Sequence, residues 1–246
     1  MKTIYDNCAI YAPDGQFLAR CSEDRIQWYL DRNLATVVSE NPTCVRLLFE
    51  PSGRDGATEI YNVSTRKNEC VVCAFVGELQ RHHVIPYSFS RYLPRICVNY
   101  NSHDILAMCE PCHHKYERAS DAKRLELAKR YNIDPTNLMV EQKRIHKLAS
   151  LCQSFDFVPE EHREKVFGLI QATAKSPMSL EEIRSYASLK AKNKKTLKFK
   201  VLSEVIVEQV TDLQAFFEEW RHHFVTVMNP QHLPEGWSIT KKVRQQ

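Results

Sequence analysis

Two Cys-x-x-Cys pairs bracket the stretch of this chain that has the most potential for chemistry. The pairs are Cys70/Cys73 and Cys109/Cys112, and the segment from Cys70 to His114 holds five of the ten histidines. Two pairs of thiolates are the ligand set of a closed tetrahedral zinc site, which stabilises a small domain and performs no chemistry itself. We predict a structural Zn²⁺ site here rather than a redox pair, because no βαβ pattern flanks either motif.

The reactive groups must then be the histidines that lie between and beside the two motifs. His82 and His83 stand in a short run that ends at Pro86 and is predicted to form a strand, and His113 directly follows the last cysteine, where a helix is expected. Consecutive strand residues point to opposite faces, so one imidazole can hold a metal ion while the other approaches a phosphate. Phosphodiester hydrolysis needs a base for water and a divalent cation for the developing charge. The alternative is that all three histidines only support a zinc-stapled binding module.

Composition and charge describe an ordinary globular protein. Of the 246 residues, 43% are hydrophobic and 26% are charged, and the formal net charge of +4 is a mild basic bias that is compatible with a polyanionic partner. No apolar run approaches the roughly 20 residues needed to cross a bilayer, and the first residues lack a secretory h-region, so no membrane partner is expected. The cysteines outside the two motifs are Cys8, Cys21, Cys44, Cys97 and Cys152. Their scattered placement is typical of free thiols in a reducing, intracellular compartment.

Residues 1–66 are predicted to form a small unit of mixed structure. The predicted elements are a β-hairpin that turns at 13–15, a helix with Ser22 as N-cap, and a buried strand over 44–49 that stops at 51–53. The simplest interpretation is a module that packs on its neighbour. The alternative is a nucleic-acid platform, if Arg46 and Arg54 lie beside exposed aromatic side chains.

Residues 67–120 form the metal-bearing unit, and residues 121–246 are predicted to be mainly helical. The expected helices cover 121–130, a segment with Val140, Ile145 and Leu148, then 160–174, 179–190 and 204–228. The segment 190–200 is the most cationic stretch, which is typical of either a solvated linker or a set of phosphate contacts. The tail after Trp237 is predicted to be mobile. The predicted fold class is therefore α+β.

The motifs in residues 67–120 resemble those of the HNH (His-Me finger) endonucleases. The shared pattern is C-x-x-C, then H-H-x-I-P, a polar residue nine positions before the final histidine, and C-x-x-C-H. The resemblance implies a β-hairpin and helix around one metal ion, with His82 and His113 as metal ligands and His83 as general base. At the position that gives the HNH family its middle letter, this chain has Asp104 instead of Asn. A carboxylate there can orient the base or become a further ligand of the metal ion. Glu117 matches a further ligand of some members and suits a hard cation, Mg²⁺ or Mn²⁺, with Zn²⁺ as the alternative.

DNA or RNA is the substrate that this resemblance implies. Arg81 and Lys115 lie next to the histidines in the sequence and could contact flanking phosphates. Lys194 and Lys195 in the cationic segment are further candidates for nucleic-acid contacts. The predicted function is a metal-dependent endonuclease that hydrolyses phosphodiester bonds.

A wider resemblance covers nearly the whole chain, to the C-terminal region of the exonuclease 3′-5′ domain-containing protein 2 family. It rests on Tyr5-Asp6-Asn7-Cys8, Ala12-Pro13-Asp14-Gly15, Gln27-Trp28-Tyr29, Phe49-Glu50-Pro51, Gly53-Arg54, Cys70-Val71-Val72-Cys73, Asn101-Ser102-His103-Asp104, His223-Phe224 and His232-Leu233-Pro234. In that family a DEDD-type exonuclease domain precedes this region, and no stretch before Cys70 matches its spaced carboxylates. The resemblance thus implies the alternative function of a non-catalytic zinc module that binds nucleic acid or protein and assists a DEDD-type exonuclease chain, in the nucleus or mitochondrion.

Overall fold

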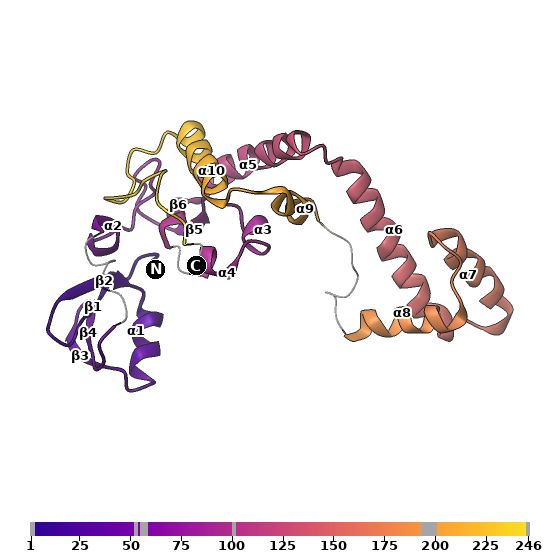
Figure 1. The fold of residues 1–246 in the computed structure, drawn as a ribbon, viewed down its shortest axis with the longest axis horizontal. Helices are drawn as coiled ribbons and strands as arrows, with labels where there is room; N and C mark the ends of the chain where they lie inside the picture. Colours follow the sequence, from indigo (N-terminus) through magenta and orange to yellow (C-terminus); the bar gives the residue numbers. More distant parts are fainter. Residues whose placement is uncertain (1–2, 52–53, 55–58, 100–101, 193–200, 245–246) are drawn as a thin grey trace. The chain divides into compact units, whose positions relative to one another are not determined.

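A computed structural model describes residues 3–51, 54, 59–99, 102–192 and 201–244. The fold is mixed α+β, and the chain divides into two compact units (Figure 1). The first unit comprises Met1–Ala122 and Val210–Gln246, and the second comprises Lys123–Gln209. The predicted three-part division of the sequence stays a prediction, and the structure adds that residues 210–246 pack with the N-terminal half of the chain.

A four-stranded sheet with one helix opens the first unit. The strands are β1 (Cys8–Tyr11), β2 (Phe17–Cys21), β3 (Ala35–Glu40) and β4 (Thr43–Leu47), in the order β2-β1-β4-β3, and the helix is α1 (Glu23–Leu30). The predicted hairpin is confirmed, with Gly15 at φ +88° in the turn. Ile26 of α1 packs on Ile10 and Val45 of the sheet. Strand β3 was not predicted, because only Ala35 of its residues is buried and the sequence shows no clean alternation there.

The two arginines of the alternative platform differ in their surroundings. Arg54 pairs with Asp14 and with Glu50, at 2.6 Å in each case, so its charge is already neutralised by carboxylates. Arg46 is exposed on β4. The residues 52–53 in the predicted end of the strand lie outside the described residues.

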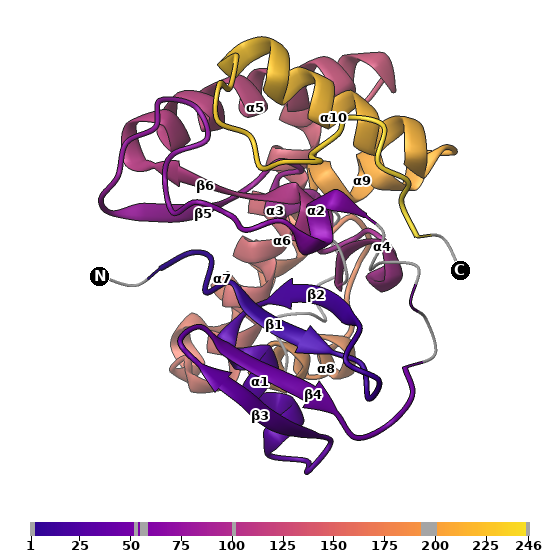
Figure 2. The ribbon, with the colours of Figure 1, turned by 90° about the vertical axis from the view of Figure 1, so that its left-hand side faces the viewer.

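A second, two-stranded sheet carries the histidines. Strand β5 (Leu79–His83) pairs antiparallel with β6 (Ile105–Cys109), which confirms the strand predicted at His82 and His83. The short helices α3 (Tyr87–Ser90), α4 (Arg95–Asn99) and η2 (Ser102–Asp104) connect the two strands, and α2 (Ile60–Val63) precedes them. Helices α5 (Glu110–Arg130) and α10 (Leu213–Met228) lie on one side of this hairpin (Figure 2).

Helix α5 is longer than predicted at its start and is continuous. It begins at Glu110, before Cys112, and it runs to Arg130 without the separate start that was predicted at residue 121. Pro111 is tolerated because it falls in the first helical turn, where its missing N–H has no helical acceptor. No Gly or Pro follows it before residue 131, so nothing in the sequence interrupts the helix.

The second unit is helical, as the sequence indicates. It contains α6 (Pro135–Ser154), η3 (Phe155–Phe157), α7 (Glu160–Thr173), α8 (Leu180–Lys192) and α9 (Leu202–Gln209). Its core includes Leu148, Cys152, Phe155, Ile170 and Ile183. The capping box at the start of α8 is confirmed, because the Ser179 N–H donates to Glu182 and the Glu182 N–H donates to the Ser179 hydroxyl, at 2.7 and 3.2 Å. Among the described residues, no helix combines the length and apolar character that a bilayer crossing requires.

The single helix predicted over residues 204–228 is wrong. Helix α9 ends at Gln209 and α10 begins at Leu213, since Asp212 caps the second helix by accepting a hydrogen bond of 3.0 Å from the Ala215 N–H. The apolar stripe that motivated the prediction is the buried face of α10. Its buried apolar members are Phe216, Phe217, Trp220, Phe224 and Met228.

The predicted mobility of the C-terminal tail is also wrong for residues 238–244, which pack within the first unit. The Trp237 indole N–H donates to the His103 carbonyl at 2.9 Å, and the Ser238 N–H donates to His103 Nε2 at 3.0 Å. Further along, the Val243 N–H donates to the side chain of Gln214 at 2.8 Å. The tail therefore belongs to the packed structure, which its polar sequence alone does not indicate.

Candidate functional site

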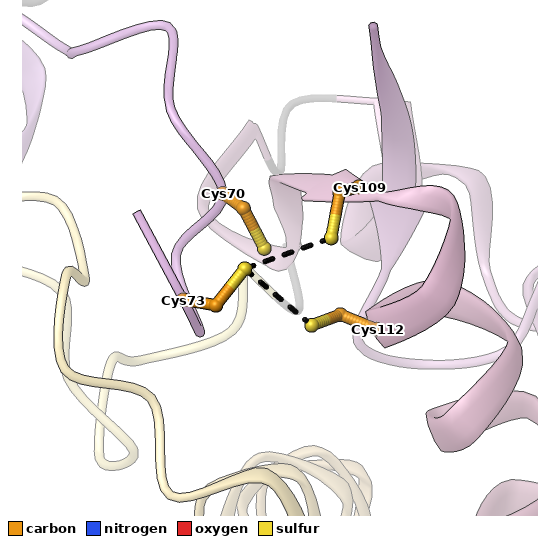
Figure 3. Close-up of side chains that lie close together, drawn as sticks. All are labelled: Cys70, Cys73, Cys109 and Cys112. Carbon is orange, nitrogen blue, oxygen red and sulfur yellow. Dashed lines mark hydrogen bonds between the residues drawn. The ribbon is translucent and has the colours of Figure 1, made fainter. Parts of the chain in front are cut away.

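The four cysteines of the two motifs converge in space (Figure 3). Cys70 and Cys73 come from the loop before β5, Cys109 ends β6, and Cys112 lies in the first turn of α5. The Sγ atom of Cys73 is 3.7 Å from that of Cys109 and 3.8 Å from that of Cys112, and all four sulfurs lie within 4.8 Å of one another. A tetrahedral centre with metal–sulfur bonds of about 2.3 Å has sulfurs about 3.8 Å apart. Together these cysteines could hold a metal ion.

Backbone hydrogen bonds fix the loop that carries the first two cysteines. The Cys70 N–H donates to the Phe75 carbonyl and the Ala74 N–H donates to the Cys70 carbonyl, at 2.9 Å each, while Ala74 takes a left-handed φ of 58°. The Val71 N–H donates to the carbonyl of Ala107 in β6 at 3.0 Å. The cysteines are thus brought together by the protein backbone as well as by their spacing.

The thiols have unequal acidity. Burial raises the pKa of the Cys70 thiol, but hydrogen bonds from the backbone N–H groups of Cys109, Cys73 and Val72 outweigh it and bring the pKa to about 7. Burial raises the pKa of Cys109 and of Cys112. Without a cation the four thiols cannot all be thiolates, so metal binding would release protons from this site.

His82 is buried where the hairpin meets both long helices. Its side chain is nearly inaccessible, with a residue exposure of 3%, and its ring lies 5.2 Å from His113 and 4.9 Å from Tyr116 of α5, and 5.6 Å from Phe224 of α10, centroid to centroid. Neither ring nitrogen has a hydrogen-bond partner. Burial first, then the charges of His113 and His83, lower the pKa of His82 to about 3. A neutral imidazole with free nitrogens is the form that binds metal ions.

On α5, three side chains in successive turns could hold a second metal ion. His113, His114 and Glu117 place one ligand atom each within 4.8 Å of the others. The Glu117 carboxylate is 3.5 Å from His113 Nδ1 and 3.0 Å from His114 Nδ1. His82 contacts His113 but is not one of this group of three in the described part of the chain. His114 was not predicted as a ligand, although its spacing of three residues from Glu117 is a usable signal.

His83 points away from His82, as neighbouring strand residues must. It is half-buried and lines a cavity of about 50 Å³ together with Asp104, Ile105, Ser90 and Phe217. Burial, followed by the charge of His113, lowers the pKa of His83, so the ring is neutral near pH 7. The cavity exceeds the roughly 15 Å³ that one water molecule requires. A neutral imidazole therefore borders a space that can hold water.

The carboxylate of Asp104 forms an ion pair with an arginine. Its two oxygens accept from Nε and Nη2 of Arg221 on α10, at 2.7 and 2.8 Å, and both side chains are buried. The Asp104 carbonyl accepts from the Val84 N–H at 2.9 Å, next to His83 in the chain. Sequence reasoning missed Arg221, since no local pattern relates positions 104 and 221.

The structure describes two of the four side chains that were predicted to contact phosphates. Arg81 lies on β5 and Lys115 on α5, and both are exposed. Lys194 and Lys195 lie outside the described residues. Arg81 and His83 are two residues apart on one strand, so their side chains leave the same face of the hairpin.

Comparison with known proteins identifies relatives for almost all of this chain. The human exonuclease 3′-5′ domain-containing protein 2 is 30% identical over 253 residues, which are 96% of this chain and 40% of the human protein. The Drosophila melanogaster protein of the same name is 29% identical over 260 residues, 97% of this chain and 43% of that protein. The chain is homologous to exonuclease 3′-5′ domain-containing protein 2 over nearly its whole length.

The chain spans about two fifths of the length of these curated relatives. A shorter match of 132 residues, at 36% identity, is to Protein RRP6-like 3 of Arabidopsis thaliana, and it covers 53% of this chain and 15% of that protein. No family model matches the chain, and no solved structure matches it.

Proposed function

We propose that this chain is a metal-dependent nuclease module of the HNH type that hydrolyses phosphodiester bonds in DNA or RNA. The observation that carries the proposal is the meeting of a strand histidine, His82, with a helix histidine, His113, beside a second strand histidine that faces a cavity. The names of the relatives, which include exonuclease-domain proteins and an RRP6-like protein, favour a nuclease-related role.

In this proposal each residue has one task. His83 accepts the proton of the attacking water, because its imidazole is neutral and borders a cavity of sufficient size. His82, His113 and Glu117, with His114 as a fourth candidate, hold the cation, which supplies charge neutralisation at the scissile phosphate. Because imidazole ligands suit Mn²⁺ and Zn²⁺ better than Mg²⁺, we expect Mn²⁺ to support more activity than Mg²⁺.

The four cysteines are proposed to bind a structural Zn²⁺. Four thiolates with the sulfur spacing of a tetrahedral centre leave no open position for substrate. Their task is to join the loop before β5 to the end of β6 and the start of α5. This linkage holds the strand of His82 and His83 against the helix of His113.

Cleavage of circular plasmid and of single-stranded oligonucleotides, with Mg²⁺, Mn²⁺ or Zn²⁺, tests the proposal. His83→Ala should lower the rate about 100-fold or more, the usual contribution of a general base. His162→Ala, an exposed histidine of the second unit, is the matched control and should cleave at the parental rate. If His83→Ala cleaves as fast as the control, the assigned base is wrong.

A specific observation also favours the second candidate, a non-catalytic zinc module that assists a DEDD-type exonuclease chain. Both oxygens of Asp104, at the family's middle position, are held by Arg221 and are therefore not open to a cation. This candidate predicts salt-sensitive nucleic-acid binding without cleavage, equal binding by His83→Ala, and recovery of an exonuclease chain in a pull-down.

A further inference from the structure

A second cavity in the first unit is lined by four arginines. It has a volume of about 250 Å³ and lies between the N-terminal sheet and the β5–β6 hairpin. Arg20 comes from β2, Arg25 from α1, Arg66 from the segment before the first cysteine motif, and Arg81 from β5. Asp6 is the single carboxylate among the lining residues. Four arginines against one aspartate give the lining a formal charge of +3, a much higher density of positive charge than that of the whole chain, which carries +4 over 246 residues.

The arginines are not neutralised by carboxylates. In the described part of the chain, no ion pair links any of the four to Asp or Glu. Arg20 donates to the Asn7 carbonyl and Arg66 to the Tyr61 carbonyl, and the Nε atoms of both are buried without a hydrogen-bond partner. Buried donors without acceptors cost free energy, which an anionic ligand with several oxygens would remove.

Contacts among the lining residues and their neighbours preorganise the cavity. Asn7 and Arg66 exchange two hydrogen bonds of 2.9 Å, from the Asn7 amide to the Arg66 carbonyl and from the Arg66 N–H back to the Asn7 side chain. The Arg66 guanidinium also stacks on Tyr61, at 4.2 Å from the ring centroid. Asp6 accepts from the Thr3 hydroxyl and from the first N–H of α1, at 2.9 Å each, so the one carboxylate already has partners.

An exposed aromatic surface adjoins the arginines. A wider hollow of about 530 Å³ is lined by Asp24, Trp28 and Tyr29 of α1, and it shares Ser22 and Arg25 with the arginine cavity. Trp28 is 46% exposed, which is unusual for so large an apolar side chain, and Arg32 stacks on its ring at 4.3 Å. Positive charge beside accessible aromatic rings is the combination that single-stranded nucleic acids require, for phosphates and for unpaired bases.

We propose that the arginine cavity binds a backbone phosphate of single-stranded nucleic acid and that Trp28 stacks on an adjoining base. The cavity is smaller than the roughly 300–1,000 Å³ of typical small-molecule sites, so it suits a sugar phosphate with the base outside. Arg81 lies two residues from His83 on the same face of β5, a strand rise of about 7 Å. This inference rests on the proposed function, because it assigns the path by which a single strand of nucleic acid reaches His83.

Binding of labelled single-stranded DNA and RNA, followed by fluorescence anisotropy, tests this inference. The parent for all measurements is His83→Ala without divalent cations, so that binding is measured whether or not the protein cleaves. The double variant Arg25→Gln/Arg81→Gln alters two exposed side chains and should weaken binding roughly tenfold at low salt. The slope of the logarithm of the binding constant against the logarithm of the salt concentration should fall in magnitude by about 1.4. Trp28→Ala should weaken single-strand binding about fivefold or more and leave duplex binding unchanged.

Arg184→Gln is the matched control, since it removes an exposed arginine from α8 of the second unit. It should bind with the affinity of the parent. Equal affinity and equal salt slope in the double variant and in Arg184→Gln would overturn the inference, as would equal loss in both. Lack of cleavage by the unmodified chain would instead contradict the proposed function and leave this binding result standing.

Discussion

Asp104 and Arg221 form a buried bidentate ion pair that joins the end of the β5–β6 connection to helix α10. The two contacts measure 2.7 and 2.8 Å, and Arg221 is completely inaccessible to solvent. The third nitrogen of the guanidinium donates to the carbonyls of Ile239 and Lys241, at 3.1 and 2.6 Å. One side chain thus connects the candidate site, α10 and the C-terminal tail.

Loss of this arginine should destabilise the first unit strongly. Arg221→Met leaves the buried Asp104 carboxylate without its partner, and we expect the free energy of unfolding to fall by about 3–5 kcal/mol. Urea unfolding followed by tryptophan fluorescence measures this, because all three tryptophans lie in the first unit. Lys67→Met, which removes an exposed lysine 3.7 Å from the partly buried Glu69, is the control and should cost less than about 1 kcal/mol. Similar midpoints for the two variants would show that the pair is not structural.

Removal of one cluster cysteine should release the metal ion. Cys73→Ser retains the shape of the side chain but is a poor ligand for a soft site, so the bound zinc per chain, measured by elemental analysis, should fall by about one ion. The thermal midpoint should fall with it, to the value of chelator-treated parent protein. Cys44→Ser, outside the cluster, should keep the full metal content. An unchanged metal ratio in Cys73→Ser would rule out the four-thiolate centre.

The buried histidine should make stability fall in mild acid. The pKa of His82 is about 3 in the folded protein and near 6.5 when unfolded, so below pH 6.5 the unfolded chain binds a proton that the folded chain does not. Stability is therefore full above about pH 6.5 and decreases towards pH 3, by at most about 1.4 kcal/mol per pH unit for this group. The burial of His83 and His103 lowers their pKa values too, which adds to the effect.

His82→Phe tests this pH dependence, because the substituted ring suits the apolar neighbours Tyr116 and Phe224. Urea midpoints measured between about pH 7 and pH 5 should vary less for this variant than for the parent. His162→Phe, at an exposed position, should follow the parent. Parallel curves for His82→Phe and the parent would refute the assignment.

Trp237 should anchor the tail. Its ring stacks on His103 at 5.2 Å and 11°, and its indole N–H donates to the His103 carbonyl. Trp237→Ala loses both contacts, and we expect a loss of about 2 kcal/mol in the free energy of unfolding, measured by circular dichroism. Trp237→Phe keeps an aromatic ring and should lose about 1 kcal/mol. Trp28→Ala, at an exposed indole, should change stability by less than about 0.5 kcal/mol.

Several features were predictable from sequence because their signals are local. The hairpin at Gly15, the strand of His82 and His83, and the capping box of Ser179 and Glu182 each depend on residues that are close in the chain. Strand β3 and the break before Leu213 were missed, because an exposed strand has no apolar alternation and one capping aspartate is a weak signal inside a long apolar stripe.

By itself the sequence determined the four thiols that could hold a metal ion and the histidines on one strand and one helix, because residue type and short spacing are written in the chain. Only the tertiary structure decided that Asp104 is held by Arg221, that the tail packs on His103, and that four distant arginines line one cavity. Those pairings join residues up to 135 positions apart. They depend on how the elements pack, and no local pattern of residue types specifies such packing.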